Sequence, residues 1–423
     1  MTDPGAADLE RQALSQRVAD CILGSKESWT RRMFELGRAM RADGGGPVWD
    51  LSLGNPSLEP PEIWREAITE ILRDEPPGMH RYMTNAGFLP VRSFIAEREA
   101  ARYGIAGLEP ADVTMTVGAA GAMNVLLHSI VDPGDRVLVP APYFSEYEHY
   151  ATNAGAQLVP IPTGPGFALD LEAIDRALQA DLSRARVLLL NSPNNPTGTI
   201  YDAAALDGLA QLLHARVERE GRPLWIIEDS PYRDLVHDSA IEVPSMLGRW
   251  ANTVLVTSHS KDLGLAGERI GYLVISPQAR GRELLRRAAA FSNRTLGFVN
   301  APALMQRALP KVLGQPQGRV DVGVYAENCR RMAAGLQELG FELAPPRAGF
   351  FLFPALPARL RGGADGASDG PSGDIVLTER LREHRTIVVP GAAFGVPEHL
   401  RLSMCVDAPA VEGALEAFRA VCA

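Results

Sequence analysis

The stretch TVLVTSHSKDLGLAGERIGY, residues 253–272, decides the fold that we expect, because it joins two strand-like runs through a polar turn. TVLVTS and the run IGYLVI at 270–275 are short, apolar and rich in β-branched residues, as buried strands are. In an open α/β sheet, ligands bind at the turns that follow such strands. A lysine stands in this turn at position 261, and its role is the first question that the sequence raises.

Lysine is scarce in this chain. Of its 42 lysine and arginine residues, only Lys26, Lys261 and Lys311 are lysine. A lysine amine can lose its proton and attack a carbonyl group, whereas arginine stays protonated at any working pH. The alternative interpretation of Lys261 is an ordinary solvated loop residue, so its surroundings have to decide.

The composition limits the class of protein. A chain of 423 residues exceeds what one hydrophobic core normally serves, so we expect two domains. The net charge of −9 and the lack of a basic run argue against nucleic acid as a partner. No apolar run approaches the roughly 20 residues that span a bilayer, and MTDPGAADLERQ at the start has no signal-peptide core. We therefore expect no membrane partner.

The four cysteines are scattered, with neither CxxC spacing nor a nearby histidine cluster. This pattern favours reduced thiols in a cytoplasmic protein over a disulfide framework, and it predicts no metal site. The cysteines are Cys21, Cys329, Cys405 and Cys422.

Short apolar strands alternate with helical segments up to about residue 310. This alternation predicts an α/β fold, with a large domain built on a mostly parallel seven-stranded sheet flanked by helices. The seven predicted strands are DVTMTV, RVLVP, QLVPIP, RVLLLNS, LWIIED, TVLVTS and IGYLVI.

The region after residue 310 has a different pattern. A long helical stretch at 320–339 is followed by strand-like segments in FELAPPRAGFFLFP, TIVVPG and HLRLSM, which together predict a smaller α+β domain. Apolar residues at helical spacing also predict a helix from about 25 to 42, and the low-complexity segment 361–373 is expected to be a mobile surface loop. The predicted organisation is an N-terminal arm at 1–24, a small domain made of 25–50 and 311–423, and a large domain at 51–310.

Polar or small residues follow four of the predicted strands. GAAGAMN at 118–124 would present free backbone N–H groups at a helix N-terminus, which suits a phosphate, although such turns are also common for packing reasons. Asp229 ends a buried strand, where an acid either meets a charge or caps a helix. NSPNNPTG at 191–198 is denser in amides and prolines than a plain loop requires. The turn with Lys261 is the fourth of these strand ends.

One cofactor accounts for all four strand ends. Pyridoxal 5′-phosphate needs a lysine for its aldehyde, an acid that keeps its ring nitrogen protonated, and donors for a dianionic phosphate. An ion pair at about 4 Å in a protein-like dielectric is worth on the order of 4 kcal/mol, or about three pKa units. Asp229 could therefore keep the ring nitrogen protonated at neutral pH.

The motifs together resemble those of a known family. SLGNPS, HRYMTNAGFLPVR, GAAGAMN, APYFSEY, NSPNNPTGTIY, EDSPYRDL, SHSKDLGLAGERIGY and RLSM occur in the order that the fold-type I, class I/II pyridoxal-phosphate aminotransferases show. The resemblance to this aspartate aminotransferase superfamily runs from about residue 25 to the end of the sequence. It implies that Lys261 forms the Schiff base and moves protons, that Asp229 pairs with the ring nitrogen, and that Tyr232 and Asn195 bind the phenolic oxygen.

The resemblance implies further binding roles. Tyr143 would stack on the cofactor ring, and Tyr82 would reach the phosphate from the partner subunit of a homodimer. The remaining phosphate ligands would be Gly118, Ala119, Ala120, Ser258 and Arg269. The substrate α-carboxylate would be bound by Arg401, with Gly54, Asn55 and Asn195 beside it.

Four residues differ from the family pattern or lie at its edge. His259 and Ser230 stand where tyrosine and glutamate are common in the subgroup, and Ala119 stands where many relatives have serine or threonine. Arg294, in FSNRTLGF, lies in the region where aspartate-specific relatives place an arginine for a second carboxylate, and a purely structural role is the alternative.

The function that these residues predict is transfer of an amino group between an amino acid and a 2-keto acid. The alternative is a biosynthetic enzyme with the same cofactor that catalyses β- or γ-elimination, cyclisation or carbon–carbon bond formation, for example on S-adenosylmethionine. A cofactor-binding regulator is a third hypothesis. We do not favour it, because only about 25 residues precede the expected catalytic fold, too few for the DNA-binding domain that such regulators carry.

Overall fold

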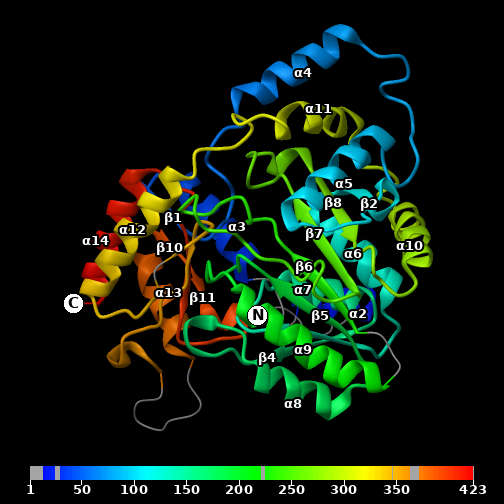
Figure 1. Cartoon of the computed structure of the whole chain (residues 1–423). Coiled ribbons are helices and arrows are strands. Elements are labelled where there is room, and N and C mark those ends of the chain that lie inside the picture. Colours follow the sequence, from blue (N-terminus) through cyan, green and yellow to red (C-terminus); the bar gives the residue numbers. More distant parts are fainter. Residues whose placement is uncertain (1–12, 24–28, 221–223, 345, 363–370, 423) are drawn as a thin grey trace.

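The computed structural model describes residues 13–23, 29–220, 224–344, 346–362 and 371–422. Its centre is a seven-stranded sheet in the order β2-β8-β7-β6-β5-β3-β4, in which only β8 runs antiparallel to its neighbours (Figure 1). The predicted mostly parallel sheet is confirmed, and each strand matches a predicted run to within a residue or so at either end. The strands are β2 (Val113–Val117), β3 (Arg136–Pro140), β4 (Gln157–Ile161), β5 (Ala185–Asn191), β6 (Trp225–Asp229), β7 (Thr253–Ser258) and β8 (Ile270–Ile275).

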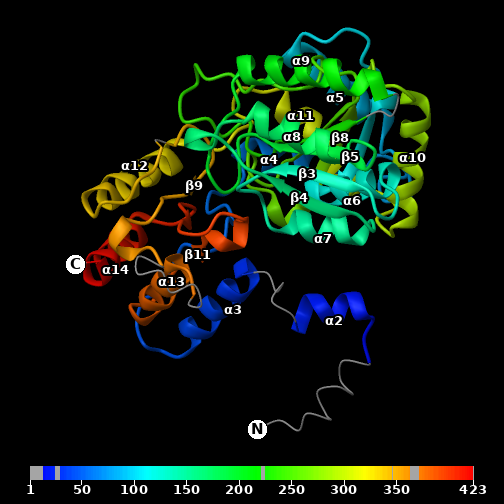
Figure 2. The ribbon, with the colours of Figure 1, turned by 90° about the horizontal axis from the view of Figure 1, so that it is seen from below.

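Helices cover both faces of this sheet, because alternate residues of each strand point to opposite sides and both sets are apolar. In β5, Val187 and Leu189 pack against α6 and α7, whereas Leu188 and Leu190 face α8 and α9. Figure 2 shows the resulting layers. The helices around the sheet are α4 (Glu62–Asp74), α5 (Leu89–Tyr103), α6 (Gly118–Ile130), α7 (Glu146–Asn153), α8 (Leu171–Asp181), α9 (Ala203–Glu220), α10 (Arg282–Thr295) and α11 (Ala303–Leu313).

A second group of elements lies beside the sheet and has its own core (Figure 2). Strands β11, β12 and β9 form an antiparallel sheet, and β1 pairs in parallel with β10. These elements are α3 (Trp29–Ala42), β1 (Trp49–Asp50), α12 (Gly323–Glu338), β9 (Phe351–Leu352), α13 (Gly373–Glu383), β10 (Thr386–Ile387), β11 (Val389–Pro390), β12 (Leu400–Ser403) and α14 (Ala408–Cys422).

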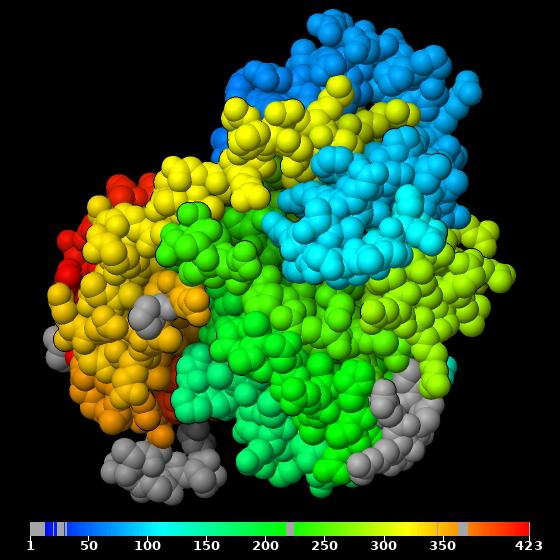
Figure 3. All heavy atoms as spheres, viewed as in Figure 1, coloured from blue at the N-terminus to red at the C-terminus, as the bar shows by residue number. Residues whose placement is uncertain are grey.

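The N-terminal part of the described chain contains α2 (Gln16–Leu23) and α3, and the first residues of the helix predicted from 25 lie outside the described residues. Most of the loop predicted at 361–373 also lies outside them. On the opposite side of the molecule, α4 packs on α11 at the top of Figure 3, where Lys311 binds Glu70. Among the described helices, none has the length and apolar character needed to cross a membrane.

Candidate active site

A cavity of about 460 Å³ lies at the carboxyl ends of β5, β6 and β7, between the large sheet and the second group of elements. Its position follows from the strand register, because Asn191 at the end of β5 lies opposite Asp229 at the end of β6, and Ser258 ends β7. Many residues predicted from separate motifs meet in its lining. They are Gly54, Ala119, Ala120, Asn195, Asp229, Tyr232, Ser258, Lys261, Arg269 and Arg401.

Asp229 is buried at the end of β6, and only one of its carboxylate oxygens has a hydrogen-bond partner. The Tyr147 hydroxyl donates to Oδ2 at 2.6 Å, whereas Oδ1 is buried without a partner. Burial raises the pKa of Asp229 to about 6, and the bond from Tyr147 acts in the opposite direction. A cationic N–H donor placed in the cavity would satisfy Oδ1 and lower this pKa.

Lys261 extends into the same cavity from the turn after β7. Its Nζ donates to the carbonyl oxygen of Gly54 at 2.5 Å and lies 5.6 Å from the centre of the Phe350 ring. Burial lowers the pKa of Lys261 to about 8, and the charges of Arg401 and Arg269 act in the same direction. An amine with a pKa near 8 is uncharged in about one molecule in ten at pH 7, far more than an ordinary lysine, and nucleophilic attack and proton transfer require the uncharged form.

Arg401, on β12, is 1% exposed and contacts only neutral acceptors. Its Nη1 donates to Asn195 Oδ1 at 3.3 Å, Nη2 donates to the Ser52 carbonyl, and Nε is buried without a partner. The guanidinium lies between the rings of Phe351 and Phe394, at 4.9 and 4.8 Å from their centres. Burial lowers its pKa to about 10. Because a buried guanidinium without a carboxylate is unfavourable, this one is suited to bind an incoming carboxylate.

The opposite end of the cavity is suited to a phosphate. Helix α6 begins at Gly118, so its first backbone N–H groups, which have no acceptor within the helix, face this end together with Ala119 and Ala120. The Ser258 hydroxyl and the Arg269 guanidinium complete the set. A Cβ atom at Gly118 would stand 2.9 Å from Nη2 of Arg269, so glycine is what lets the guanidinium lie against the helix start.

These features fit pyridoxal 5′-phosphate. Asp229 has a free buried oxygen for the protonated ring nitrogen, Lys261 offers an amine of lowered pKa for the aldehyde, and the α6 N-terminus with Arg269 offers donors for the phosphate. Asn195 and Tyr232 line the space between these groups.

Comparison with known proteins agrees with this geometry. A family model described as aminotransferase class I and II matches residues 47–418. The chain belongs to the class I and II aminotransferases. It is 30% identical to the aspartate/prephenate aminotransferase of Thermus thermophilus over 97% of this chain and 99% of that protein. An amino transferase from Eubacterium rectale superposes with a TM-score of 0.85 at 31% identity, covering 96% of this chain and 98% of that chain. The Thermus thermophilus aspartate aminotransferase with maleate gives 0.81 at 29% identity, covering 96% and 99%. The chain is therefore a pyridoxal-phosphate-dependent enzyme that transfers amino groups.

Five residues predicted for the site of this aminotransferase do not line the cavity. Tyr143 is buried beside it, where its hydroxyl donates to Glu148 at 2.7 Å and its ring packs against Gly395. The neighbouring Phe144 faces the cavity instead, so the aromatic ring in the lining lies one residue further along than predicted. The other four are Gly118, Asn55, Tyr82 and Arg294. Gly118 contributes only by leaving room for the Arg269 guanidinium.

Some lining residues were not predicted. Tyr147 is the main one, because it is fully buried on α7 and holds Asp229 in place. The spacing of APYFSEY contains Phe144 and Tyr147, but nothing in the motif says which of its rings faces the ligand. Further lining residues are Phe34, Leu53, Met123, Glu146, Tyr150, Asn191, Pro231, Ser260, Ala266 and Phe351.

The residues that depart from the family pattern have structural contacts. The Ser230 hydroxyl donates to the Ser192 carbonyl at 2.8 Å, which links the ends of β5 and β6. His259 is buried, and its Nδ1 lies 2.9 Å from Oδ2 of Asp262. Lys261 lies between these two residues in the sequence. Neither Ser230 nor His259 lines the cavity.

Proposed function

We propose that the aminotransferase reaction takes place in this cavity, with Lys261, Asp229 and Arg401 as its principal groups. The observation that carries the proposal is the convergence of three incompletely paired polar groups on one space of about 460 Å³. These are an amine of lowered pKa, a carboxylate oxygen without a partner and a guanidinium without a carboxylate.

Each residue has a distinct task. Bound pyridoxal 5′-phosphate supplies an aldehyde for covalent attachment and a ring that withdraws electrons from the substrate Cα–H bond. Arg401 binds the substrate α-carboxylate, and Asn195 fixes the orientation of its guanidinium. Nζ of Lys261 would attach the aldehyde and, when free, would take up and return the proton of the substrate Cα. Oδ1 of Asp229 holds the ring-nitrogen proton, and Tyr147 positions that carboxylate.

The substrates that we propose are an amino acid and a 2-keto acid, with aspartate or glutamate as amino donor. The relatives named aspartate/prephenate aminotransferase support this choice. Within the described residues of one protomer, the cationic side chains that line the cavity are Lys261, Arg269 and Arg401. The first two are committed to the cofactor, so a distal carboxylate needs a cation from elsewhere. Arg294 of a partner subunit is the proposed source.

A homodimer would supply that arginine. Tyr82 is 90% exposed, which is unusual for a large aromatic side chain, and the segment that carries it is tied to the end of α10 by a hydrogen bond from Asn293 to the Asn85 carbonyl. Leu89, Leu284 and Phe291 are exposed hydrophobic residues of α5 and α10. These features support an interface through which Tyr82 reaches the phosphate of the partner site.

We also propose a division into a small domain, 25–50 and 311–423, and a large domain, 51–310, with an N-terminal arm before them. The separate core of the elements beside the large sheet supports it. The four cysteines of the chain are unpaired, which supports a reducing compartment such as the cytoplasm.

The test is a single-turnover experiment with a panel of amino acids. The holoenzyme would be mixed with aspartate, glutamate, alanine, methionine or S-adenosylmethionine without a keto acid, and the products weighed by mass spectrometry. We expect one equivalent of 2-keto acid per active site, followed by arrest until a keto acid is added. Continuous product formation without an acceptor would instead indicate elimination or cyclisation. Asp229→Asn should bind cofactor but lose most exchange of the substrate Cα–H with deuterium, because a neutral pyridine withdraws electrons poorly.

A further inference from the structure

A second cavity, of about 700 Å³, lies behind the candidate active site. The two cavities are separated by the segment after β6, because Tyr232 lines the first and the adjacent Arg233 lines the second. Its walls come from the end of α5, the start of α9, the 233–249 segment, the residues just before α12, and Arg347. No part of the aminotransferase mechanism above uses this space.

The lining of the second cavity is rich in arginine. Five arginines line it, and three of them pair with carboxylates of the fold: Arg102 with Asp234, Arg233 with Glu99 and Arg249 with Asp207. The other two arginines have either a distant acidic partner or none among the described residues. The five are Arg102, Arg233, Arg249, Arg319 and Arg347.

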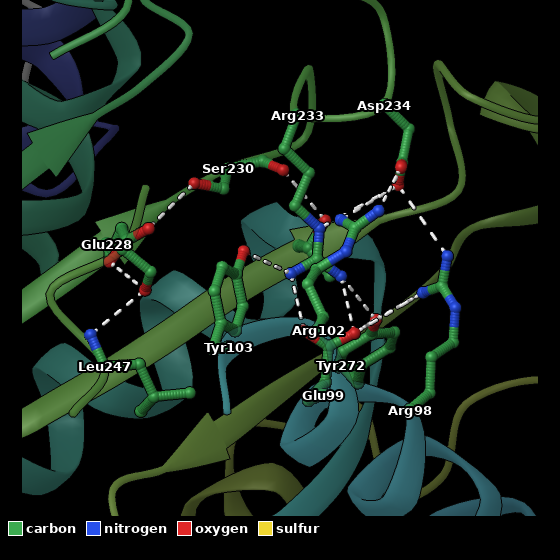
Figure 4. Close-up of polar contacts among 12 residues, drawn as sticks. Arg98, Glu99, Arg102, Tyr103, Glu228, Ser230, Arg233, Asp234, Leu247 and Tyr272 are labelled. Carbon is green, nitrogen blue, oxygen red and sulfur yellow. Dashed lines mark hydrogen bonds and ion pairs between the residues drawn. The ribbon is translucent and has the colours of Figure 1, made fainter. Parts of the chain in front are cut away.

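The two under-neutralised arginines are Arg319 and Arg347. Arg319 is 64% exposed and reaches only Asp234, at 4.0 Å, while Asp234 already pairs with Arg102. Arg347 is exposed, and no acidic group of the described chain pairs with it. Figure 4 shows how the side chains of Arg98, Arg102 and Arg233 gather around Asp234 and Glu99. Although burial opposes the effect, the charges of Arg102 and Arg233 hold the pKa of Asp234 well below its usual range.

Arg233 is buried beside this cavity and already has acidic partners. Its side chain is 2% exposed, and its Nη groups donate to both oxygens of Glu99 at 2.7 Å. Its Nε has no hydrogen bond within the described residues, but it lies 3.9 Å from Oδ2 of Asp234. Arg233 is therefore held by acidic groups of the fold, and it adds positive charge to the wall of the cavity without being free to bind a ligand.

The remaining walls are largely apolar, and the volume falls within the roughly 300–1,000 Å³ typical of small-molecule sites. The ligand that suits such a space has an apolar body and a negatively charged head with two or more oxygen atoms. The apolar lining residues include Ile200, Val236, Val243, Leu247, Val320 and Val322.

We propose that the second cavity binds a small organic anion, whose carboxylate or phosphate head is held by Arg319 and Arg347. The head needs at least two oxygens because these donors come from two separate segments of the chain. The apolar body lies against the valine and leucine walls. This site is distinct from the one that holds the cofactor and the α-carboxylate, so it does not depend on the proposed catalytic roles.

Isothermal titration calorimetry of the holoenzyme tests this proposal with defined probes. Phenyl phosphate and phenylacetate carry the two head groups on an aromatic body, inorganic phosphate carries a head alone, and benzyl alcohol has the body with no charge. We expect one of the two charged aromatic probes to bind saturably, and more tightly than inorganic phosphate or benzyl alcohol. The stronger of the two probes identifies the head group. Saturable binding of neither charged aromatic probe would overturn the proposal, and equal binding of benzyl alcohol would show that no anion is recognised.

The matched variants locate the binding. Arg319→Glu/Arg347→Glu should weaken binding of the best probe at least about tenfold, because two charge-assisted hydrogen bonds are lost. Arg65→Glu/Arg73→Glu, on exposed sites of α4, changes the net charge equally and should leave binding unchanged. Equal loss in both double variants would overturn the proposal, since it would show a general charge effect. Arg319→Gln/Arg347→Gln should give an intermediate affinity, and an unchanged melting temperature would show that each variant is folded. Probe binding that survives both replacements of Arg319 and Arg347 would place it at the α-carboxylate site instead.

Discussion

Arg401 and Arg233 are both almost completely buried, 1% and 5% exposed, yet their surroundings are opposite. Arg233 makes a bidentate pair with Glu99, and although burial opposes it, that carboxylate raises the pKa of Arg233 well above its usual value. Arg401 contacts a carbonyl, an amide and two aromatic rings, and burial lowers its pKa to about 10. One guanidinium is neutralised within the fold, and the other is left for a ligand.

The difference separates a structural charge from a functional one. A buried charge is tolerated when it is paired, and removing one partner of such a pair is strongly destabilising. A buried charge without a partner is a cost to the folded chain, and a substrate that supplies the missing partner recovers that cost as binding energy. The same reasoning covers Asp229 and Lys261, whose pKa values burial shifts toward their neutral forms.

The largest expected effect is the loss of activity in Lys261→Ala. Because this amine both attaches the cofactor and moves the proton, we expect kcat to fall by about four orders of magnitude or more. Lys311→Ala is the matched control, since Lys311 binds only Glu70 on the surface, and it should keep full activity. The measurement is steady-state turnover together with a peptide map of the borohydride-reduced holoenzyme. Attachment of the cofactor to a lysine other than Lys261 would contradict the assignment.

Replacing each buried arginine by methionine tests the comparison directly. Arg401→Met should lower kcat/KM, because the substrate carboxylate loses its partner. The loss should correspond to about 2–5 kcal/mol of transition-state stabilisation. Its free energy of unfolding should not fall, since no carboxylate of the described chain is left unpaired. Arg233→Met should do the reverse and lower the free energy of unfolding by up to about 3–5 kcal/mol, because buried Glu99 loses its bidentate partner and keeps only Arg98, at 3.4 Å, and the Tyr272 hydroxyl.

The double variant Arg233→Met/Glu99→Met provides the control. Removing both charges together should recover most of the stability that Arg233→Met loses. Urea unfolding and kinetics on the same preparations would decide the matter. If Arg401→Met proved as unstable as Arg233→Met, the distinction between the two arginines would be wrong.

Much of the fold followed from the sequence, because each core strand is a short apolar run between polar turns. Both faces of the sheet are buried, so β5 and β7 have no exposed side that would interrupt the pattern. The cofactor end of the site could be predicted from the sequence for a related reason. Residues at the carboxyl ends of parallel strands meet at one edge of the sheet. Lys261, Asp229 and Asn195 were predicted from this rule and from their motifs, and the structure brings them to one cavity.

What the sequence could not provide was orientation within irregular segments and contacts between distant ones. Tyr143 and Phe144 are adjacent in a stretch without helical or strand periodicity, so no pattern says which ring faces the cofactor. Tyr147 acts through a contact with Asp229 that spans 82 residues. The second cavity had no motif, because its arginines come from segments as far apart as Arg102 and Arg347.

The pH dependence of apoprotein stability sharpens the contrast at Asp229. Burial raises the pKa of Asp229 from 3.8 to about 6, so between these values the folded chain binds more protons at this site than the unfolded chain. Its contribution to stability is therefore fully present below about pH 3.8 and is lost as the pH rises through 6. Relative to Asp229→Asn, the wild-type apoprotein should lose about 3 kcal/mol of unfolding free energy across this window.

Urea unfolding of both apoproteins at a series of pH values measures the difference. Tyr147→Phe removes the hydrogen bond that lowers this pKa, so its window should extend to higher pH. Parallel stability curves for wild type and Asp229→Asn would show that the carboxylate is not held in an unfavourable environment.

The smallest expected effect concerns a third arginine, Arg294, which is exposed at the end of α10 and stacks on Phe291 at 5.7 Å. It is neither paired like Arg233 nor enclosed like Arg401, so its function depends on whether a partner subunit places it over the neighbouring site. If it binds the distal carboxylate there, Arg294→Ala should lower kcat/KM for aspartate and glutamate at least about thirtyfold and spare alanine and methionine. Arg65→Ala, at an exposed site of α4, should affect neither class. Equal losses for dicarboxylic and neutral substrates would instead show that Arg294 supports the fold. No loss for either class would show that a distal carboxylate is bound by another group.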